Sequence, residues 1–574
     1  MPRSNPSLAV FVYAYIFLFV GIYGGSDVMD MKLSLADECL DDEHEGCALV
    51  ALQRHGRKTS QAEEMSRSDQ PTPGTTSDYS RPANAPDLAT SSFVPNEDCD
   101  SPPCSGQVHL LLGAPDEMVV SFASLPEAFT KPRVRFKKAG SRQDSEVAVG
   151  STETYNLLYY WKDDLWAPRM AGGHGLSRGK VAELQSTNTW AFPGSPAWRY
   201  RTAANISTGL GWYKNPAENY NSPAIHTVIL RDLEPGQKYT YQVDNDGREF
   251  TFKMPAEGST AFPYKVGLVS DLGQTPVSNA SIHMLKEMDP KPEVVLLAGD
   301  LSYADGYYDR WDSFGILFEQ LGAEMPLLTC PGNHEQGTGE AYKSYNVRYP
   351  MPYLESDSID KNYWSRTTGP MHVISLNSYA SSESNSFQYR WLERQLLQFS
   401  RVKTPWLVVM MHVPFYSSNN AHAGEGQPNQ KNLEDLFYKY GVNIVLAGHV
   451  HAYERSWPVY QNKTDTCGTT YLTLGDGGNR EGPAAEWLPG VEDEYAPIWS
   501  AFRQSSFGVG SLTFENASHA RLAWNRNACF DNGEIELDYE NCETIANGVK
   551  DNSLHSEPTD VAWIVRPTEC QNQS

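Results

Sequence analysis

At 574 residues and 64.0 kDa, with 40% hydrophobic and 11% aromatic residues, the chain has the size and composition of a globular protein with two or three domains. Its formal net charge of -25 and pI near 5.0 argue against a polyanionic partner such as nucleic acid. A small phosphate-containing substrate is not excluded, because bound metal ions can reverse the local charge.

Residues 1–26 are typical of a secretory signal peptide. Arg3 precedes a 17-residue apolar run from Leu8 to Gly24, which small residues follow. An uncleaved signal anchor is the alternative, because this length is borderline for a membrane span. We expect a secreted protein, extracellular or vacuolar, without a stable membrane partner after cleavage.

Acceptor sequences for N-glycosylation agree with export. The N-x-S/T pattern occurs at Asn205, Asn279, Asn462, Asn516 and Asn572. The chain also has nine cysteines. In an oxidising compartment these permit the local pairs Cys39–Cys47, Cys99–Cys104 and Cys529–Cys542, although sequence does not fix connectivity. Zinc-site spacing is absent, so a structural zinc is not expected.

The region before residue 258 has two parts that differ in composition and hydrophobic pattern. Residues 27–105 are predicted to be a disordered linker or pro-segment, because they are charged or rich in Pro, Ser and Thr and lack a hydrophobic period. From 106 to 257, apolar and polar residues alternate between turn signals. The alternating segments are QVHLLLG, EMVVSFAS, PRVRFKK, AIHTVILRDL, KYTYQVDN and REFTFKMP. They predict a small antiparallel β-sandwich with an aromatic-rich insertion at 155–200.

Residues 262–528 follow a different pattern, in which apolar runs of strand length alternate with helical segments. Nearly continuous Val, Ile and Leu runs predict strands that are buried on both faces, and the intervening helices predict βαβ crossovers. We therefore predict an α/β domain here. Residues 529–574 are predicted to be a C-terminal tail without an assigned function.

Five of these apolar runs end in residues that can bind a metal ion. The runs are KVGLVSDLG, EVVLLAGDLSYAD, MPLLTCPGNHE, WLVVMMH and VNIVLAGHVH. The candidate ligands are Asp271, Asp300, Tyr303, Asn333, His412, His449 and His451. Ligands of α/β sheets bind beyond the carboxyl ends of the strands, so these side chains are expected to meet. Each residue alone has an ordinary structural explanation, but five runs in order favour two adjacent cations.

The five blocks resemble those of the purple acid phosphatases, a branch of the metallophosphoesterase superfamily. That family's pattern is D-x-G, G-D-x-x-Y, G-N-H-[DE], V-x-x-H and G-H-x-H, and here the blocks read DLG, GDLSY, GNHE, VMMH and GHVH. The resemblance covers roughly residues 106–528 and is closest to the plant-like high-molecular-weight branch. It implies an all-β fibronectin-III-like sandwich followed by an α/β metallophosphoesterase-type β-sandwich that is flanked by helices.

The resemblance also implies an activity and two cofactors. The chain would be an acid phosphatase that hydrolyses small phosphate monoesters with a metal-bound hydroxide, at a pair of ions that clamps the ester. Fe(III) would be held by Asp271, Asp300, Tyr303 and His451. A divalent Zn, Mn or Fe ion would be held by Asp300, Asn333, His412 and His449. Asp300 would bridge the two ions.

Substrate contacts are implied next to these ligands. Asn333 and His334 would face the substrate, and His334 would hydrogen-bond the phosphoryl oxygens or protonate the leaving alkoxide. Asp305 is expected to orient His334 or a water molecule, with an ordinary turn carboxylate as the alternative. His422 matches a second substrate-facing histidine of the family. Plant-like relatives often have a histidine pair there, whereas this chain has Ala421, which leaves the substrate range open.

Other functions fit the same residues less well. A phosphodiesterase or nucleotide pyrophosphatase of the same fold would use the same metal ligands, because substrate choice is determined by loops. A binding protein with a vestigial metal site would usually have lost a ligand, and none is missing here. Some plant-like relatives are disulfide-linked dimers, and the odd cysteine count permits a homodimer in this protein too.

Overall fold

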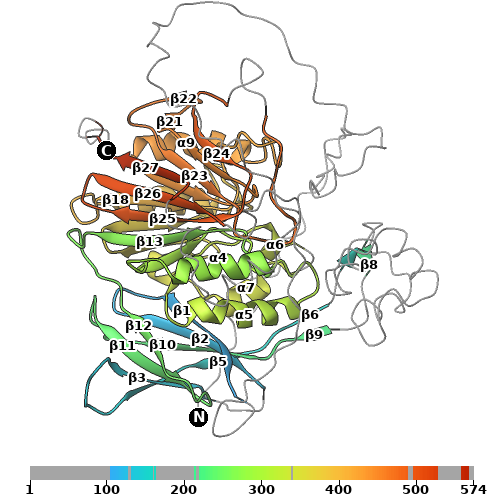
Figure 1. The fold of residues 1–574 in the computed structure, drawn as a ribbon, viewed down its shortest axis with the longest axis vertical. Helices are drawn as coiled ribbons and strands as arrows, with labels where there is room; N and C mark the ends of the chain where they lie inside the picture. Colours follow the sequence, from blue (N-terminus) through green and yellow to red (C-terminus); the bar gives the residue numbers. More distant parts are fainter. Residues whose placement is uncertain are drawn as a thin grey trace, which may run out of the picture. The chain divides into compact units, whose positions relative to one another are not determined.

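The computed structural model describes most of the chain after residue 103 (Figure 1). The described residues are 104–126, 131–158, 161–162, 213–214, 219–337, 340–488, 496–527, 558–567 and 570. The predicted signal peptide and linker, and most of the predicted insertion and tail, lie outside them. So do Asn205, Asn572, Cys39, Cys47, Cys99, Cys529 and Cys542. Among the described helices, none combines the length and apolar character that a membrane span requires.

The N-terminal region is an all-β sandwich, as predicted, and each of the six alternating segments forms a strand. One layer contains β1 (Gly106–Leu112), β2 (Met118–Ser124), β10 (Ala224–Leu230) and β5 (Ser151–Glu153). The other contains β12 (Phe250–Lys253), β11 (Lys238–Val243), β3 (Arg133–Lys138) and β4 (Glu146–Val149). On β3, Val134 and Phe136 are buried whereas Arg133 and Arg135 are exposed, which is the period of two expected of a half-buried strand.

Two short ladders lie near the predicted insertion. β6 (Asn156–Leu158) pairs with β9 (Asn219–Asn221), and β7 (Trp161–Lys162) pairs with β8 (Tyr213–Lys214).

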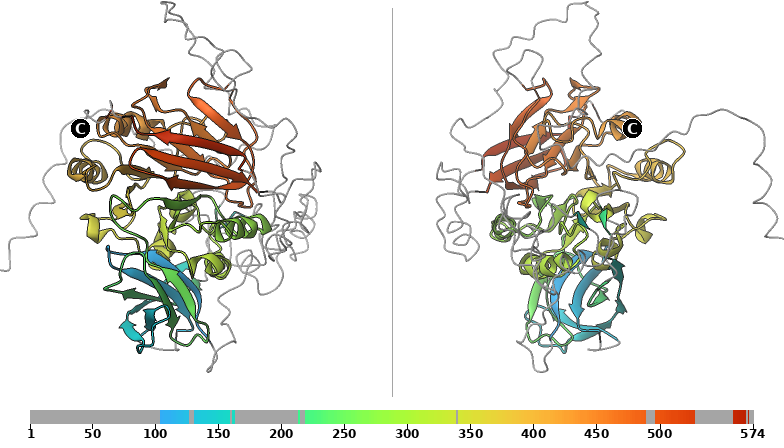
Figure 2. Two further views of the ribbon diagram at one scale, coloured as in Figure 1. Left: turned by 60° about the vertical axis from the view of Figure 1, so that its left-hand side comes forward. Right: turned by 90° about the vertical axis from the view of Figure 1, so that its right-hand side faces the viewer.

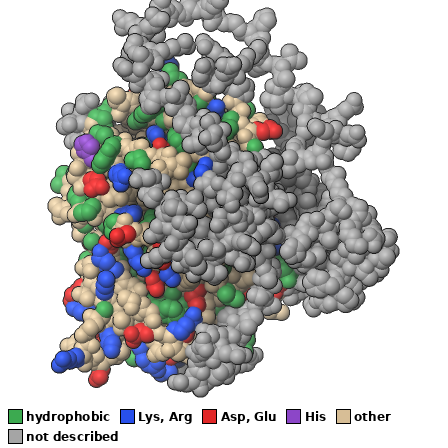
Figure 3. Space-filling view, in the orientation of Figure 1, with side chains coloured by type: hydrophobic (Ala, Val, Ile, Leu, Met, Phe, Trp, Pro, Cys, Tyr) green, Lys and Arg blue, Asp and Glu red, His purple; other side chains and the backbone are tan. Residues whose placement is uncertain are grey.

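On the face that Figure 3 shows, Lys and Arg side chains are interspersed with Asp and Glu over the described part of the sandwich. Lys138 and Glu234, for example, form an ion pair at 2.5 Å.

The α/β region contains two packed sheets (Figure 2). The first joins the parallel strands β13 (Tyr264–Val269), β14 (Val294–Leu297) and β15 (Leu327–Thr329) to the antiparallel β25 (Gly508–Phe514), β26 (His519–Arg526) and β27 (Asp560–Val565). The second has the order β16 (Trp364–Thr368), β17 (Met371–Ser375), β18 (Trp406–Met410), β19 (Ile444–Ala447), β23 (Thr470–Leu474), β20 (Tyr453–Ser456) and β24 (Ser500–Gln504). A separate hairpin pairs β21 (Val459–Tyr460) with β22 (Lys463–Thr464).

Strand β18 shows how this packing follows from a continuous apolar run. Its alternate residues Val408 and Met410 belong to the core shared by the two sheets. Leu407 and Val409 point the other way, into a second core that includes Phe437 of a covering helix. Because both faces are covered, every position of the strand must be apolar, and this agrees with the prediction of strands buried on both faces.

The described part of the α/β region also contains six α-helices. They are α4 (Pro276–Lys286), α5 (Asp309–Gly322), α6 (Asn333–Gln336), α7 (Lys343–Arg348), α8 (Phe387–Gln398) and α9 (Gln427–Lys439), with a 3-10 turn η1 (Leu354–Ser356). The first of them begins at a capping box: the Thr275 hydroxyl accepts from the backbone N–H of Ser278 at 3.1 Å, and the Ser278 hydroxyl accepts from that of Thr275 at 2.9 Å.

The first sheet does not end at the predicted domain boundary. β1 of the sandwich pairs in parallel with β15 of the α/β region, with Leu111 opposite Leu327, so a single ten-stranded sheet runs through both. Strand β27 extends the opposite end of this sheet, although it belongs to the segment predicted as a tail. The folded region therefore extends beyond residue 528.

A buried arginine connects the same two regions. Arg348 of α7 donates to Asp312 Oδ1 at 2.7 Å, to the hydroxyls of Tyr155 and Tyr220 at 2.8 and 2.9 Å, and to Gln107 Oε1 at 2.8 Å. Its side chain is 3% exposed. A buried guanidinium is tolerated only when its charge is paired and its N–H groups have acceptors, and this network meets both conditions.

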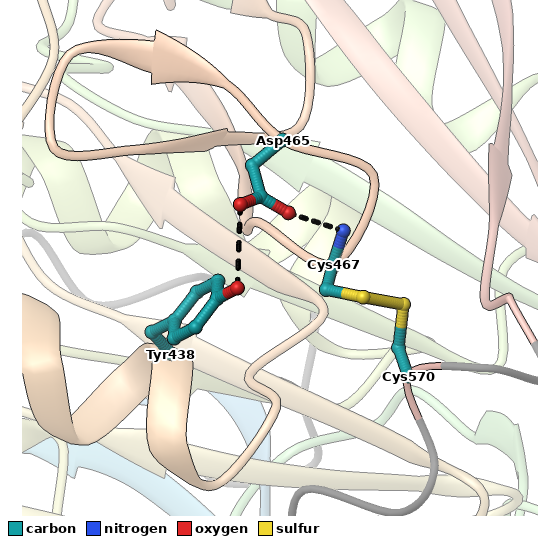
Figure 4. The surroundings of a disulfide bond; sticks show 4 residues. All are labelled: Tyr438, Asp465, Cys467 and Cys570. Carbon is teal, nitrogen blue, oxygen red and sulfur yellow. Dashed lines mark hydrogen bonds between the residues drawn. A yellow bond between two sulfur atoms is a disulfide. The ribbon is translucent and has the colours of Figure 1, made fainter.

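A disulfide that the sequence analysis did not predict joins Cys467 to Cys570, 103 positions apart (Figure 4). Cys104 is also disulfide-bonded, whereas Cys330 is free and buried. Asp465 lies beside the bond, where one of its oxygens accepts from the Cys467 backbone N–H at 2.8 Å. Linking two such distant positions removes much conformational freedom from the unfolded chain.

The three described acceptor asparagines have different environments. Asn462 and Asn516 are exposed, and both lie in turns between strands. Asn279 lies on α4, where its Oδ1 accepts from Gln320 Nε2 at 2.7 Å. Glycosylation at all three stays a prediction, and Asn279 is the least accessible of them because its side chain is half-buried.

We predict that Arg348→Ala lowers the free energy of unfolding by about 3–5 kcal/mol, because the Asp312 carboxylate is left buried without its cation. Urea denaturation followed by circular dichroism measures the loss. The matched control is Arg390→Ala on the exposed surface of α8, for which we expect a change within about 0.5 kcal/mol. Equal losses in the two variants would contradict the assigned role of Arg348.

Candidate binuclear metal centre

The candidate ligands follow strand ends, and four of them have an unusual backbone conformation. Asp271 follows β13, Asp300 and Tyr303 follow β14, and His449 follows β19. Their φ angles are 53°, 53°, 52° and 68°, in the left-handed region. For residues other than glycine this conformation costs on the order of 1–3 kcal/mol, and it concentrates at functional sites. Here it turns the chain sharply at each strand end.

Two glycines of the motifs make room for the carboxylates. A Cβ atom on Gly332, in G-N-H-E, would lie 2.0 Å from Asp300 Oδ1. A Cβ atom on Gly448, in G-H-V-H, would lie 2.2 Å from Asp271 Oδ2. Both distances are far below van der Waals contact, so any side chain at either position would displace a carboxylate.

Three of the candidate ligands form a first cluster. The Tyr303 hydroxyl lies 3.2 Å from Asp271 Oδ1 and 3.1 Å from His451 Nε2, and the imidazole lies 3.4 Å from the same carboxylate oxygen. The other ring nitrogen of His451, Nδ1, is 3.1 Å from the carbonyl of Gly482. When Nδ1 carries the proton that this carbonyl accepts, Nε2 is left with its lone pair directed at the cluster.

A second cluster lies beside the first. His412 Nε2 is 3.1 Å from Asp300 Oδ2 and 3.1 Å from Asn333 Oδ1. Its Nδ1 is 2.8 Å from the carbonyl of Ala298, which again leaves Nε2 to face inward. Donor atoms of Asp300, His412 and His449 all lie within 4.8 Å of one another. The structure thus brings together all seven ligands that the sequence analysis proposed.

The ionisable groups of the two clusters interact electrostatically. His412 Nε2 is also 4.0 Å from Asp271 Oδ1. Burial alone would raise the pKa of the Asp271 and Asp300 carboxyl groups, but the neighbouring His412 imidazole holds both below their usual range. Burial and the two carboxylates raise the pKa of Tyr303 well above that of a free phenol. A strongly charged cation is therefore needed before this phenol can ionise.

His334 is held next to the second cluster by residues from two segments, which follow β14 and β23. Asp305 makes short contacts with His334 Nδ1 and with the Arg480 guanidinium, and Glu481 Oε1 lies 3.8 Å from His334 Nε2. Burial lowers the pKa of His334, but Asp305 and Asp300 more than offset this and raise it well above its usual value. The expected contact between Asp305 and His334 is present in the structure.

Sequence reasoning missed Arg480 and Glu481. They follow β23 in the sequence GDGGNREG, so their position at a strand end was visible. Neither residue lies in one of the five motif blocks. Only the three-dimensional arrangement shows that they reach Asp305 and His334.

His422 reaches the site from a loop between β18 and α9. Its Nδ1 lies 3.0 Å from Glu425 Oε2, and the same oxygen lies 2.9 Å from His449 Nε2. The His422 and His449 rings are 3.8 Å apart between centroids. Glu425 therefore connects a candidate substrate-facing residue to a candidate ligand. The sequence signal for it was weak, because a carboxylate three positions after a histidine is common.

Glu335, the last residue of G-N-H-E, was also missed. One carboxylate oxygen accepts from the backbone N–H groups of Asp300 and Gly332 at 2.9 and 2.8 Å, and the other accepts from that of Leu301 at 2.9 Å. The side chain is fully buried. It thereby fixes the backbone on which Asp300 turns, and the motif that contains it does not reveal this contact, because Asp300 lies 35 positions away.

The donor set fits two cations. Atoms that bind one ion at about 2.0–2.2 Å lie roughly 3 Å from one another. Within each cluster the closest donor atoms are 3.1 Å apart, and carboxylate, phenol, amide and imidazole donors converge there in a buried space. The first cluster has a carboxylate and a phenol with one imidazole, whereas the second has a carboxylate and an amide with two imidazoles, which suits two ions of different charge.

Comparison with known proteins gives matches along most of the described chain. Family models match residues 264–453 (calcineurin-like phosphoesterase), 468–536 (iron/zinc purple acid phosphatase-like protein C) and 105–254 (purple acid phosphatase, N-terminal domain). Purple acid phosphatase 21 of Arabidopsis thaliana is 44% identical over 313 residues, which are 54% of this chain and 69% of that protein. Fe(3+)-Zn(2+) purple acid phosphatase 12 of the same plant is 39% identical over 333 residues, 54% of this chain and 70% of that protein.

A solved structure is similar in fold. Purple acid phosphatase PPD1 from yellow lupin (Lupinus luteus) seeds superposes with a TM-score of 0.57 and 22% identity, over 77% of this chain and 76% of that one. The arrangement of a β-sandwich before an α/β region is thus shared with a known protein.

We predict that Glu335→Gln lowers both metal content and thermal stability. A glutamine has one acceptor oxygen, so at least one of the three backbone N–H groups would face its NH2 group, at a cost of about 1–3 kcal/mol. Elemental analysis should give fewer metal ions per chain, and differential scanning calorimetry a lower Tm. The control, Glu355→Gln on an exposed turn, should retain both values. Full metal content in Glu335→Gln would show that this carboxylate is dispensable.

Proposed function

Because the chain belongs to the purple acid phosphatase family, we propose that it is an acid phosphatase that hydrolyses small phosphate monoesters at a pair of metal ions. One observation carries the proposal: seven donor side chains from the ends of β13, β14, β15, β18 and β19 converge in two adjoining clusters. Such a site is costly to keep in a fold that does not use it, because its buried carboxylates require compensation.

The first cluster, with Asp271, Tyr303 and His451, would hold Fe(III). The second, with Asn333, His412 and His449, would hold a divalent Zn, Mn or Fe ion, and Asp300 would be shared. When bound, the two ions would supply Lewis acidity, which polarises the phosphoryl group and lowers the pKa of coordinated water. One relative is named an Fe(3+)-Zn(2+) enzyme, and this supports the same pair here.

Three side chains, one of them the ligand Asn333, would contact the substrate. Asn333 and His422 would donate hydrogen bonds to phosphoryl oxygens and fix the ester in place. His334, through Nε2, would donate to a phosphoryl oxygen or protonate the leaving alkoxide. Asp305 would position the ring by accepting from Nδ1, so that the proton on Nε2 faces the substrate. Glu425 would hold His422 in the same way.

We further propose that the protein enters the secretory pathway and is secreted or vacuolar. The disulfide between Cys467 and Cys570 supports this, because such bonds persist in oxidising compartments.

We predict that the metal-replete protein releases phosphate from a simple aryl phosphate fastest below about pH 6.5, when assayed from about pH 3 to about pH 9. The reason is that the acidification of coordinated water by Fe(III) persists at low pH. Asp300→Ala should reduce turnover about a thousandfold, roughly 4 kcal/mol of barrier. Asp435→Ala, an exposed carboxylate of α9, should leave it unchanged. Diester cleavage without monoester cleavage would instead indicate a phosphodiesterase.

We predict that Tyr303→Phe abolishes the visible absorption of the metal-replete protein, because the colour would come from charge transfer between the phenolate and Fe(III). Phenylalanine keeps the ring that packs 4.1 Å from His334, so the fold should be preserved. Tyr379→Phe is the matched control: its hydroxyl donates to Asn333 Oδ1 at 3.2 Å but is not a proposed ligand. Unchanged colour in Tyr303→Phe would remove the phenolate from the iron site.

A further inference from the structure

Two arginines lie side by side at the opposite end of the second sheet from the metal clusters. Arg401 precedes β18, and Arg566 directly follows β27. Both donate a hydrogen bond through Nη1 to the same backbone oxygen, the carbonyl of Pro405. Two guanidinium groups are thereby held within a few ångströms of one another, which is unfavourable unless something compensates their charge.

The partners of Arg401 are all uncharged. Its Nη1 also donates to Asn443 Oδ1 at 2.9 Å, and its Nη2 donates to the carbonyls of Tyr440, at 3.2 Å, and Gly441. These bonds fix the guanidinium group without pairing it with an anion, and among the described residues its charge is met only by the face of the Phe399 ring, 5.1 Å away. Burial and the neighbouring Arg566 lower the pKa of Arg401 to about 10, which reflects the same deficit of negative charge.

Arg566 differs, because one edge of its guanidinium group has no hydrogen-bond partner among the described residues. Nη1 is bonded to the Pro405 carbonyl, whereas Nε is buried without a hydrogen-bond partner and Nη2 has none among the described residues. The Nε–Nη2 edge is the planar fork with which arginine binds carboxylates and phosphates through two parallel hydrogen bonds. Leaving a buried N–H without an acceptor costs about 1–3 kcal/mol.

No carboxylate of the described chain forms an ion pair with either arginine. This is notable in a protein with 71 acidic and 46 basic residues. Asp465, beside the disulfide, bonds to other groups: one oxygen accepts from the Tyr438 hydroxyl at 3.2 Å and the other from the Cys467 backbone N–H (Figure 4). Within the part of the chain that the structure describes, the two positive charges are therefore not paired with a carboxylate.

The two arginines line a small cavity of about 40 Å³. The Cys467–Cys570 disulfide and Asn443 contribute to the same wall. Pro405 immediately precedes β18, whereas the metal-cluster residue His412 follows its other end. At about 3.3 Å per strand residue, the cavity and the clusters are separated by roughly 20 Å.

From this arrangement we propose a second anion site, in which the Nε–Nη2 edge of Arg566, beside Arg401, binds a small tetrahedral oxyanion of the phosphate or sulfate class. The anion would give the unused fork its two acceptors and compensate the paired positive charges. The small cavity suits an inorganic ion. The site does not depend on the proposed catalytic function, because it uses none of the residues of the metal clusters.

The test is the number of phosphate ions bound per chain, measured by equilibrium dialysis of the metal-replete protein with radiolabelled inorganic phosphate. We expect two for the unmodified protein, one at the metal centre and one at Arg566. Arg566→Gln should retain one, with affinity at the second site reduced at least about tenfold, and should leave kcat and KM for an aryl phosphate unchanged. Arg566→Lys, which keeps the charge but lacks the fork, should also weaken the second site.

Arg521→Gln is the matched control, because it removes one charge from an exposed position on the neighbouring strand β26 and should keep two ions. Competition with sulfate distinguishes the natural anion: displacement by sulfate at lower concentration than phosphate would assign the site to sulfate. A circular dichroism spectrum identical to that of the unmodified protein shows that Arg566→Gln is folded.

One ion in the unmodified protein, or two ions in folded Arg566→Gln, would overturn the proposal and leave the two arginines as structural links to Pro405. An inactive protein that still binds a phosphate ion lost only in Arg566→Gln would refute the proposed phosphatase function and support the second site. The failures of the two proposals are thus distinguishable.

Discussion

Two carboxylates in one buried space set the constraint that the α/β region satisfies. Asp271 and Asp300 are almost completely inaccessible, and an unpaired buried carboxylate costs several kcal/mol even after relaxation. His412 lies between the two carboxylates, and backbone N–H groups donate to their oxygens. Motif glycines allow both carboxylates to approach neighbouring backbone. What remains uncompensated is negative charge, and cations are the natural complement.

This constraint explains how the second sheet stacks on the first. Asp271 and Asp300 extend from the first sheet, whereas His412 and His449 extend from the second. Their side chains meet only if the two sheets stack with their carboxyl ends aligned. The alternating residues of β18, one set buried between the sheets and the other under the helices, produce that stacking. The chemistry at the strand ends thus depends on apolar side chains that never touch a ligand.

Sequence reasoning succeeded where the information is local. Six of the eight sandwich strands were predicted, and the seven candidate ligands that lie close together were proposed, because a period of two, or a polar residue after a buried run, is visible in a short segment. It failed where the contact is distant. Glu335 reaches Asp300, Glu425 reaches His449 and Arg480 reaches Asp305 only because folding brings them near. Cys467 likewise pairs with a residue 103 positions away. Strand β27 was missed because its short apolar run follows a long polar stretch.

The pairing of β1 with β15 also limits how the molecule can be divided. If the sandwich were removed, β15 would become the edge strand of the sheet. Its backbone N–H and C=O groups could then pair with a strand of another protein molecule. The sandwich therefore acts as an edge cap for the α/β half. Evolutionary shuffling of that half into another protein would require a replacement cap, so the two regions are expected to be inherited together.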